Sequence, residues 1–411
     1  MISQIETCCK RPAFNGEARK EVVNSGSFPV TGPSITSMDL DVTVRCNLAC
    51  DYCFKEKDRR EMSLETARDA ICWLIFASMD ARRLQVNFMG GEPLLRFDLI
   101  KELVPFAKRR ASQHNKFIHF GVTTNGTIMS DEIIEFWNRW GLGFHTSIDG
   151  CPEAHNLHRH FADGRPTSLL LERNLPKILA VRPLTTARAT VLPDTIRYLP
   201  ESFEYILNMG YKNVAFVPGS YPQWDKSAVK EFGRQFGIIS QRVMELMRSG
   251  KLIKLKFFDE GCATIAKGQI PKPGRQACGA GRGMALVDVN GDIWPCHRWS
   301  KNSEIDWRLG SIYEPSFNYQ SRGLINTPVP EEELEACRKC PALFLCLGGC
   351  PAENLEDTGR IFTRHAIGCD ITKTLAKLIR KFHDTMFAEK NPVFMETYYK
   401  DLTKNKRRES K

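Results

Sequence analysis

The sequence predicts an α/β protein, with an open, partial (β/α)6 barrel followed by a cysteine-rich module. Two observations lead to this fold class. Between residues 38 and 250, short runs with the character of β-strands alternate six times with helical patterns, which is typical of a parallel sheet with helical crossover connections. After residue 250 the alternation stops, and Gly- and Pro-rich turns follow together with most of the fifteen cysteines.

Six segments of the barrel have the pattern of strands. They are residues 38–44, 84–88, 117–122, 143–147, 185–191 and 213–217. The clearest helix begins after Ser63, a favourable N-cap residue, and has Glu65 in its first turn. Its apolar positions recur at helical spacing and predict one buried face, formed by Ala67, Ala70, Ile71, Leu74 and Ile75. In such folds the loops at the carboxyl ends of the strands carry the functional residues.

The chain is predicted to have four parts. Residues 1–37 are rich in Gly, Ser, Pro and Thr and form an irregular N-terminal segment, and residues 38–250 form the barrel. Residues 251–370 form the cysteine-rich module, with a hairpin near residue 290, and a module so rich in loops is usually stabilised by bound metal. Residues 371–411 form an amphipathic helix to about residue 387 and then a basic tail.

Composition excludes several classes of protein. With 42% hydrophobic and 26% charged residues, the 411-residue chain has the balance of an ordinary globular protein. Its longest apolar run has nine residues, whereas a membrane-spanning helix needs about 20. The N-terminus lacks an export signal, so we expect a cytoplasmic location. The net charge of +10 includes the tail KNKRRESK, which we interpret as solvated; an RNA substrate is a less favoured alternative.

A triplet of cysteines follows the first predicted strand. Cys46, Cys50 and Cys53 have the spacing C-x3-C-x2-C, and in a reducing compartment they are expected to be thiols. Three such thiolates can hold three irons of a [4Fe–4S] cluster and leave the fourth iron open as a binding site. A zinc site, which prefers four ligands, and three ordinary thiols are the alternatives. The position at the end of a strand favours the cluster.

This triplet resembles the signature of the radical S-adenosylmethionine (radical SAM) superfamily. The resemblance implies that the open iron chelates S-adenosylmethionine and that Tyr52 lies near the adenine. Segments after the next strands are similar to family segments that contact the cofactor. They contain Gly90, Gly91, Glu92, Thr124, Asn125, Ser147 and Asp149. Arg159 stands where the family often places a carboxylate-binding arginine, although the preceding HD pair reads His155-Asn156 here.

A second set of seven cysteines lies in the C-terminal module. It consists of Cys278, Cys296, Cys337, Cys340, Cys346, Cys350 and Cys369. The set resembles the SPASM extension of radical enzymes that modify peptides and proteins. With one more ligand, its thiolates suffice for two further four-iron clusters. A paired zinc ribbon is the alternative, but seven cysteines do not divide into two complete tetrahedral sets.

The resemblance also implies how the cysteines are shared. The first auxiliary cluster would be held by Cys278, Cys296 and Cys350, and the second by Cys337, Cys340, Cys346 and Cys369. Two alternatives remain for the fourth ligand of the first auxiliary cluster. Either Cys262, sixteen residues before Cys278, completes the cluster, or the cluster has an open iron. The expected cofactors are therefore three [4Fe–4S] clusters and S-adenosylmethionine.

These features predict an enzyme that cleaves S-adenosylmethionine reductively and uses the 5′-deoxyadenosyl radical to take hydrogen from a peptide or protein side chain. Crosslinking or oxidation of a ribosomally made peptide is preferred. In the similar anaerobic sulfatase maturases an aspartate follows the cysteine that corresponds to Cys296. The histidine here, His297, argues against formylglycine formation and is either an acid–base group or a structural neighbour of the cluster. The alternatives are formylglycine formation, a small-molecule or RNA substrate, and a non-catalytic iron–sulfur electron carrier.

The expected partners follow from this function. They are the peptide or protein substrate and an electron donor such as flavodoxin or ferredoxin. A separate leader-peptide-binding protein is a further expectation, because only 45 residues precede Cys46, close to the lower limit of about 40 for an independent domain. A membrane partner is not expected, and nucleic acid is not favoured.

Overall fold

The computed structural model describes residues 34–219, 223–268, 278–299, 307–314, 322–323, 325, 330–346 and 348–409. Most of the predicted N-terminal segment 1–37 and the side chains of the basic tail lie outside the described residues. The chain divides into two compact units. The first unit comprises Met1–Ala49, Cys53–Phe144 and Gly279–Thr327, and the second comprises Cys50–Tyr52, His145–Cys278 and Pro328–Lys411.

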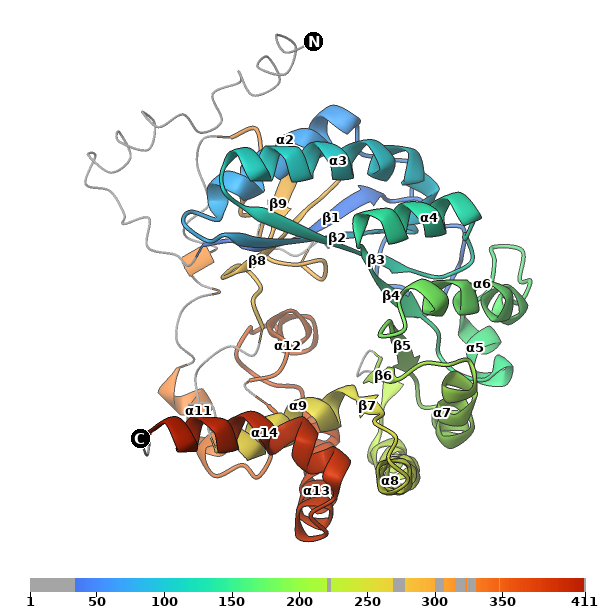
Figure 1. Ribbon diagram of the computed structural model, residues 1–411, viewed down its shortest axis with the longest axis vertical. Coiled ribbons are helices and arrows are strands. Elements are labelled where there is room, and N and C mark those ends of the chain that lie inside the picture. The colour runs from blue at the N-terminus through green and yellow to red at the C-terminus, as the bar shows by residue number, and fades with distance from the viewer. Residues whose placement is uncertain are drawn as a thin grey trace. The chain divides into compact units, whose positions relative to one another are not determined.

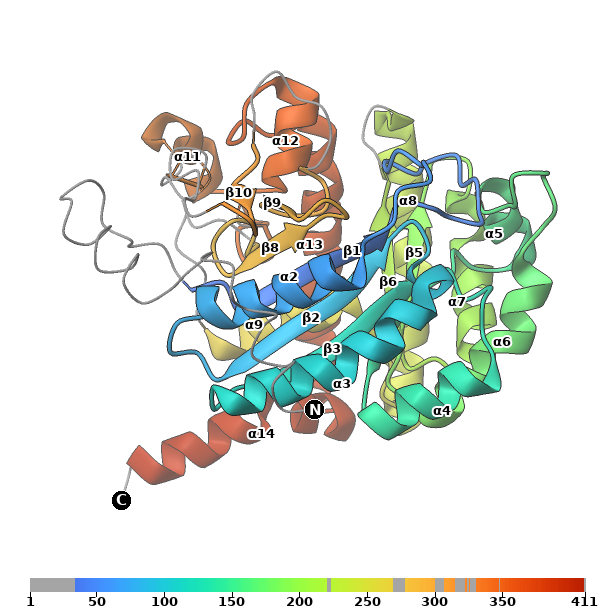
Figure 2. The ribbon, with the colours of Figure 1, turned by 90° about the horizontal axis from the view of Figure 1, so that it is seen from above.

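The first unit is built on strands in the order β10-β9-β8-β1-β2-β3. The strands are β1 (Ser37–Thr43), β2 (Arg83–Gly90), β3 (Phe117–Thr124), β8 (Met284–Val287), β9 (Asp292–Trp294) and β10 (Gly310–Ser311). The helices are α2 (Leu64–Ala77), α3 (Phe97–Gln113) and α4 (Asp131–Trp140), with the 3-10 turn η1 (Pro93–Arg96). Strands β8, β1, β2 and β3 are parallel, and β9 and β10 continue antiparallel. Helices α2 and α3 lie on one side of β1 to β3 (Figures 1 and 2).

Side chains alternate along β1 between an apolar face and an acidic one, and both faces are buried. Met38, Leu40 and Val42 are fully buried, and successive side chains of a strand point to opposite faces. Asp39 and Asp41 therefore lie on the other face of the same strand. The predicted start of α2 is confirmed, because the Ser63 side chain accepts a hydrogen bond from the Thr66 backbone N–H and thereby satisfies one of the helix's unpaired donors.

The second unit contains parallel strands in the order β4-β5-β6-β7. They are β4 (Gly143–Ser147), β5 (Thr186–Val191), β6 (Asn213–Pro218) and β7 (Lys254–Leu255). Its helices are α5 (Pro152–His158), α6 (Ser168–Val181), α7 (Leu199–Asn208), α8 (Lys226–Arg248), α9 (Lys256–Lys267), α11 (Glu331–Arg338), α12 (Pro351–Thr358), α13 (Ala366–Ala388) and α14 (Pro392–Glu409), with the 3-10 turn η2 (Ile196–Tyr198).

Aromatic side chains join the C-terminal helices to the rest of the second unit. Phe236 of α8 packs near Phe258 of α9, and Phe258 makes an edge contact with Phe382 of α13, with ring centroids 5.3 Å apart. Phe394 of α14 is fully buried and completes this cluster. The amphipathic helix predicted over 371–387 is therefore confirmed within α13, and its apolar face is buried against α8 and α9.

The predicted α/β fold is confirmed, since each of the six predicted strands is present as one of β1 to β6, with ends that differ by at most two residues. The predicted hairpin is confirmed as β8 and β9, which pair antiparallel around Gly291 with φ at +87°. The parallel pairing of β8 with β1 was not predicted. Ala285, Leu286 and Val287 are fully buried as a result, so this part of the cysteine-rich module shares the core of the first unit.

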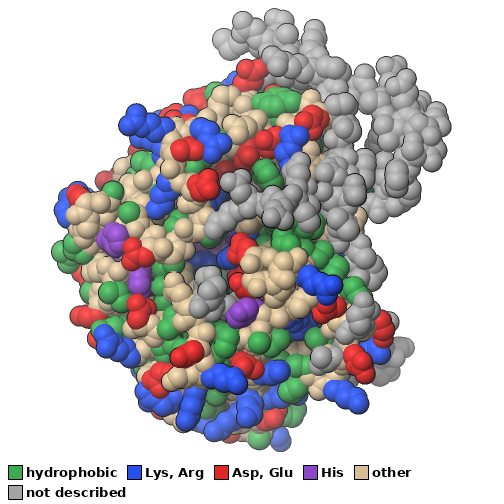
Figure 3. Space-filling model, turned by 180° about the vertical axis from the view of Figure 1, so that it is seen from behind, with side chains coloured by type: hydrophobic (Ala, Val, Ile, Leu, Met, Phe, Trp, Pro, Cys, Tyr) green, Lys and Arg blue, Asp and Glu red, His purple; other side chains and the backbone are tan. Residues whose placement is uncertain are grey.

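Acidic and basic side chains are interspersed on the face shown in Figure 3, so that charges of opposite sign partly offset each other there. Within the described residues, no helix is both long and apolar enough to span a lipid bilayer.

The ends of β1 and β2 approach so closely that only glycine fits between them. Gly90 has φ at +132°, and a Cβ atom there would lie 2.0 Å from the Thr43 carbonyl oxygen. Gly141, the C-cap of α4, also has positive φ (+69°), but a Cβ atom there would meet nothing within 4 Å. A substitution at Gly141 therefore meets only the strain of positive φ, whereas a substitution at Gly90 meets both that strain and a collision with the backbone.

We expect Gly90→Ala to lower the free energy of unfolding by about 3 kcal/mol or more, because strain in φ adds to a backbone clash. The matched variant Gly141→Ala should lose only about 1 kcal/mol, from φ alone. Urea denaturation followed by circular dichroism measures both. Equal losses in the two variants would show that the strands can move apart at this point.

Candidate functional site

The first cysteine loop begins where β1 and β2 end side by side. The Gly91 and Glu92 backbone N–H groups donate to the carbonyl oxygens of Thr43 and Arg45, each at 2.9 Å. A Cβ atom at Gly91 would lie 2.1 Å from the Arg45 oxygen. The predicted Gly90-Gly91-Glu92 segment is thus fixed directly beside the residue that precedes Cys46.

A buried carboxylate joins the ends of β2 and β3. Glu92 has no exposed surface, and one of its oxygens accepts from the Leu94 N–H (3.1 Å) and the Thr124 hydroxyl (2.8 Å). The other oxygen accepts from the Asn125 N–H at 2.7 Å. Burial raises the pKa of Glu92 to about 7, against the opposite effect of these hydrogen bonds. Glu92 therefore fixes the Thr124-Asn125 segment in place.

The same segment is tied to the cysteine loop. The Asn125 side-chain amide donates to the Asn47 oxygen at 2.8 Å, and the Asn47 amide donates to the Thr127 hydroxyl at 2.8 Å. Asn47 directly follows Cys46. The first unit therefore brings Cys46, Glu92, Thr124 and Asn125 together in one hydrogen-bonded arrangement.

The second unit positions Tyr52, Asp149 and Arg159 around a buried ion pair. Arg159 Nε donates to Asp149 Oδ2 at 2.9 Å, and the Tyr52 hydroxyl donates to the same oxygen. The other Asp149 oxygen accepts from the Thr190 N–H at 2.8 Å. Burial alone would raise the pKa of Asp149, but the charge of Arg159 and these hydrogen bonds hold it below its ordinary value. Asp149 is therefore an anion.

Arg159 also faces the cysteine loop. Its guanidinium lies over the Tyr52 ring, 5.2 Å from the centroid, and its Nη1 is 4.0 Å from Cys50 Sγ. A fixed cation next to a thiol favours the thiolate, which is the form that binds iron. Ser147 is the last residue of β4 and is half-buried.

His155 has a structural role in this unit. Its Nδ1 accepts from the Asp149 N–H at 3.2 Å, so its Nε2 carries the proton and donates to the Thr167 hydroxyl at 3.0 Å. Burial lowers the pKa of His155 to about 4, which keeps the ring neutral. The neighbouring Asn156 accepts from the N–H groups of Thr167 and Ser168. The His155-Asn156 pair thus holds the loop that carries Arg159.

His297 is paired with an aspartate that the sequence analysis missed. Its Nδ1 lies 3.2 Å from Asp39 Oδ2, and Asp39 also accepts from the Asn87 amide at 3.4 Å. The His297 ring packs against Phe54, with centroids 5.6 Å apart. About one third of the His297 side chain is exposed. The signal for Asp39 was present in the alternation of acidic and apolar residues along β1.

Four of the predicted auxiliary ligands surround one cavity in the second unit. The cavity is lined by Cys337, Cys340, Cys346 and Cys369 together with Arg364 and Lys373. Arg364 Nη1 donates to Cys346 Sγ at 3.2 Å. Four thiols and two cations around one space fit an anionic iron–sulfur cluster ligated by four thiolates, and they are the four cysteines that the resemblance grouped together.

The other predicted auxiliary ligands are not among the residues that line this cavity. Cys296 belongs to the first unit, whereas Cys278 and Cys350 belong to the second. Cys262 is fully buried in α9, and burial raises the pKa of its thiol well above the ordinary value, which disfavours the thiolate. All of the described cysteines are thiols rather than disulfides.

Comparison with known proteins places this site in a family. Residues 40–206 match the sequence model of the radical SAM superfamily. An uncharacterised protein of Methanocaldococcus jannaschii is 30% identical over 178 residues, or 43% of this chain, and the chain covers 60% of that relative's length. A cysteine-type anaerobic sulfatase-maturating enzyme of Clostridium perfringens is 25% identical over 335 residues, which span 74% of this chain and 85% of the relative.

A solved structure shows the same fold over most of the chain. Native anSMEcpe with bound AdoMet and Cp18Cys peptide superposes with a TM-score of 0.68 and 20% identity, covering 88% of this chain and 99% of that one. The matched family implies a [4Fe–4S] cluster and S-adenosylmethionine. The thiols of the first loop, with Arg159 beside Cys50, fit such a cluster. The chain is therefore an enzyme that contains a radical SAM domain in residues 40–206.

Proposed function

We propose that this enzyme modifies a side chain of a polypeptide by hydrogen abstraction, as in the maturation of a ribosomally made peptide by crosslinking or oxidation. The observation that carries the proposal is the cavity lined by four cysteines, because a second cluster site beyond the radical SAM domain matches the SPASM pattern of peptide-modifying enzymes. The similarity to a sulfatase-maturating enzyme and to a structure with a bound peptide supports it.

The proposal assigns three clusters. Cys46, Cys50 and Cys53 would hold the first, the four cavity cysteines the second auxiliary cluster, and Cys278, Cys296 and Cys350 the first auxiliary cluster, with Cys262 as the remaining ligand or with one iron open. When bound, the first cluster and S-adenosylmethionine supply the radical that abstracts hydrogen. The proposed barrel comprises residues 38–250, and the proposed cluster-binding module comprises residues 251–370.

The other named residues would bind or orient S-adenosylmethionine. Gly90, Gly91, Thr124, Asn125, Ser147 and Tyr52 would contact it. Glu92 would hold these contacts in place through its hydrogen bonds with Thr124 and Asn125. Asp149, paired with Arg159, would do so through its hydrogen bond with Tyr52. The side chains of Glu92, Asp149 and Arg159 are all buried, and their burial would keep water away from this part of the site.

His297 would move the proton that leaves the substrate. The Asp39 carboxylate beside Nδ1 fixes the tautomer in which Nδ1 carries the proton, so that Nε2 is the atom that accepts from substrate. Formylglycine formation is the second candidate function, favoured by the 25% identity to the sulfatase-maturating enzyme. A cysteine- or serine-containing sulfatase peptide tested as substrate decides between the two.

Iron content and cofactor cleavage test the assignment of the first cluster. The reconstituted protein should contain about twelve irons, four in each of three clusters, and should form 5′-deoxyadenosine from S-adenosylmethionine with dithionite. The triple variant Cys46→Ala/Cys50→Ala/Cys53→Ala should lose about four irons and all 5′-deoxyadenosine formation. Iron content equal to that of the wild type would refute the assignment of the first cluster.

A matched experiment tests the cavity. Replacing Cys337, Cys340, Cys346 and Cys369 with Ala should also remove about four irons, because four thiolates hold one cube, while Cys72→Ala, on α2, should remove none. Iron analysis and the visible absorption of the clusters measure both. A quadruple variant that keeps the full iron content would mean that the cavity holds no cluster.

Variants of His297 and Asp39 test the proposed role of His297 in proton transfer. With a polypeptide substrate encoded in neighbouring genes, His297→Ala should lower the ratio of modified peptide to 5′-deoxyadenosine by roughly tenfold to a hundredfold, as expected for a lost general base. Asp39→Asn should lower the same ratio less, because the ring remains but its tautomer is no longer fixed. Mass spectrometry of the peptide measures the ratio. An unchanged ratio in His297→Ala would remove the acid–base role, and loss of iron would make the residue a structural neighbour of the cluster.

A further inference from the structure

Two buried indole N–H groups near Cys296 have no hydrogen-bond partner in the part of the chain that the structure describes. They belong to Trp299 and Trp307, and each of these residues is only 3% exposed. A buried donor without an acceptor carries the full penalty of losing its hydration, and native proteins contain few such groups. Two of them in one place therefore indicate an acceptor that binds there.

Both indoles lie beside the segment that contains Cys296. The backbone N–H of Trp299 donates to the Cys296 carbonyl oxygen at 3.1 Å, which closes a turn, and the Cα atoms at the ends of such a turn are less than about 7 Å apart. Strand β10 pairs antiparallel with β9, and just before β10 the Leu309 N–H donates to the Ile293 carbonyl oxygen at 2.7 Å. Two residues earlier in the chain, Trp307 is therefore level with the residue that precedes Cys296. The rings of Trp299 and Trp307 are in edge contact, with centroids 4.6 Å apart.

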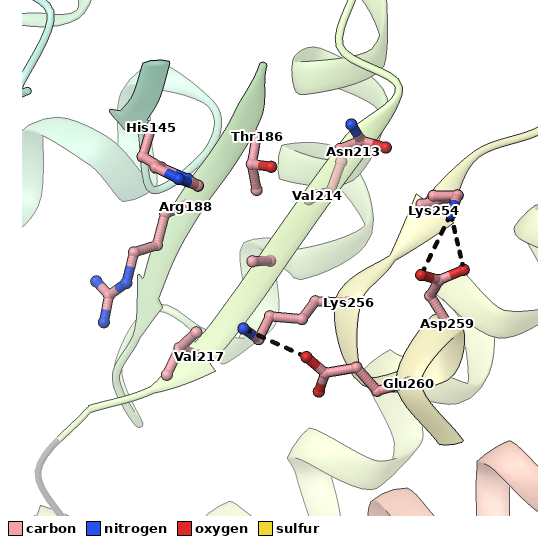
Figure 4. Close-up of a pocket in the computed structure, with 11 residues that line it drawn as sticks. His145, Thr186, Arg188, Asn213, Val214, Val217, Lys254, Lys256, Asp259 and Glu260 are labelled. Carbon is pink, nitrogen blue, oxygen red and sulfur yellow. Dashed lines mark hydrogen bonds and ion pairs between the residues drawn. The ribbon is translucent and has the colours of Figure 1, made fainter. Parts of the chain in front are cut away.

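A cavity near the start of β5, β6 and β7 gives no comparable indication of a ligand. Lys254 pairs with Asp259 and Lys256 pairs with Glu260, each at 3.4 Å, as the dashed lines of Figure 4 show. These lysines therefore have partners within the protein, whereas the two indole N–H groups have none among the described residues.

The position of the two indoles selects the class of acceptor. Cys296 is buried, with 7% of its surface exposed, and the proposed function assigns its thiolate to the first auxiliary cluster. A four-iron cluster has thiolate and sulfide sulfur atoms, and N–H groups that donate to these sulfurs are one of the means by which proteins set its reduction potential. The chemistry that fits two unpartnered donors beside Cys296 is therefore the sulfur of an iron–sulfur cluster.

We propose that the indole N–H groups of Trp299 and Trp307 donate hydrogen bonds to sulfur atoms of the first auxiliary cluster, on its Cys296 side. The inference rests on the proposed assignment of this cluster and adds two residues that tune it. Hydrogen bonds to the sulfurs stabilise the reduced, more negative state and thereby raise the reduction potential. The two tryptophans act on the cluster without being its ligands, and they make it a better acceptor of one electron.

The test is a redox titration followed by electron paramagnetic resonance, in the full-length triple variant that lacks the first cluster, so that only the auxiliary clusters are measured. Trp299→Phe and Trp307→Phe each keep an aromatic ring but remove the donor. Each should make reduction of one cluster about tenfold less favourable, which shifts its midpoint potential by about 59 mV to more negative values. The shifted signal should be the one that Cys296→Ala removes, and the potential of the other auxiliary cluster should stay unchanged.

Two other tryptophans are matched controls. Trp294 of β9 lies two residues before Cys296, but its indole N–H already donates to Asp288 Oδ2 at 3.1 Å. Trp224, just before α8, has an indole N–H without a partner among the described residues, in a segment without predicted ligands. Trp294→Phe and Trp224→Phe should both leave the two midpoint potentials unchanged. An equal shift in either control would overturn the inference, because the effect would then not depend on an unpartnered donor beside Cys296.

A second measurement needs no substitution at either tryptophan and decides if a Phe variant loses the cluster. Isotopically labelled indole nitrogen should show a hyperfine coupling to the reduced cluster in pulsed electron paramagnetic resonance, and Cys296→Ala should abolish it. A cluster without this coupling, or with an unchanged potential in both Phe variants, would overturn the inference and leave water as the partner of the indoles. A shift in only one variant would keep the assignment of that residue and overturn that of the other. If Cys296→Ala removes neither iron nor a cluster signal, the proposed cluster assignment fails instead.

Discussion

The buried ion pair between Asp149 and Arg159 organises the second unit around the cysteine loop. Both side chains are more than nine-tenths buried, and breaking such a pair by removing one partner typically costs about 3–5 kcal/mol because a charge is left without compensation. The pair is sustained by hydrogen bonds from Tyr52 and from the Thr190 backbone. Through these contacts one carboxylate, just after β4, fixes the residue before the third cysteine and the carboxyl end of β5.

A common feature links the first loop with the four-cysteine cavity. In each place an arginine is held near a thiol, Arg159 near Cys50 and Arg364 near Cys346. Positive charge close to sulfur stabilises the thiolate and, once a cluster is bound, its more reduced and more negative state. The chain therefore compensates charge at two sites that lie on unrelated parts of the sequence.

The sequence was sufficient to predict the barrel strands, because period-two alternation and strand-end glycines are local signals. The grouping of the four cavity cysteines came from the resemblance to the SPASM extension, and the structure places all four around one cavity. The sequence could not reveal that β8 pairs with β1, since pairing between residues about 250 apart depends on tertiary packing. For the same reason it did not identify Asp39 as the partner of His297, or Asn47 as the contact of Asn125. The sequence likewise did not predict that Glu92 and Arg159 form hydrogen bonds with other residues of the protein.

The position of β8 in the first unit has a consequence for synthesis on the ribosome. Strands β1 to β3 leave the ribosome long before Met284–Val287, yet β8 covers the other edge of β1. Until then the nascent chain carries an exposed strand edge, which is a template for pairing with other chains. Premature termination before residue 284 would leave that edge open permanently, so truncated products should be the species most prone to aggregation and most dependent on chaperones.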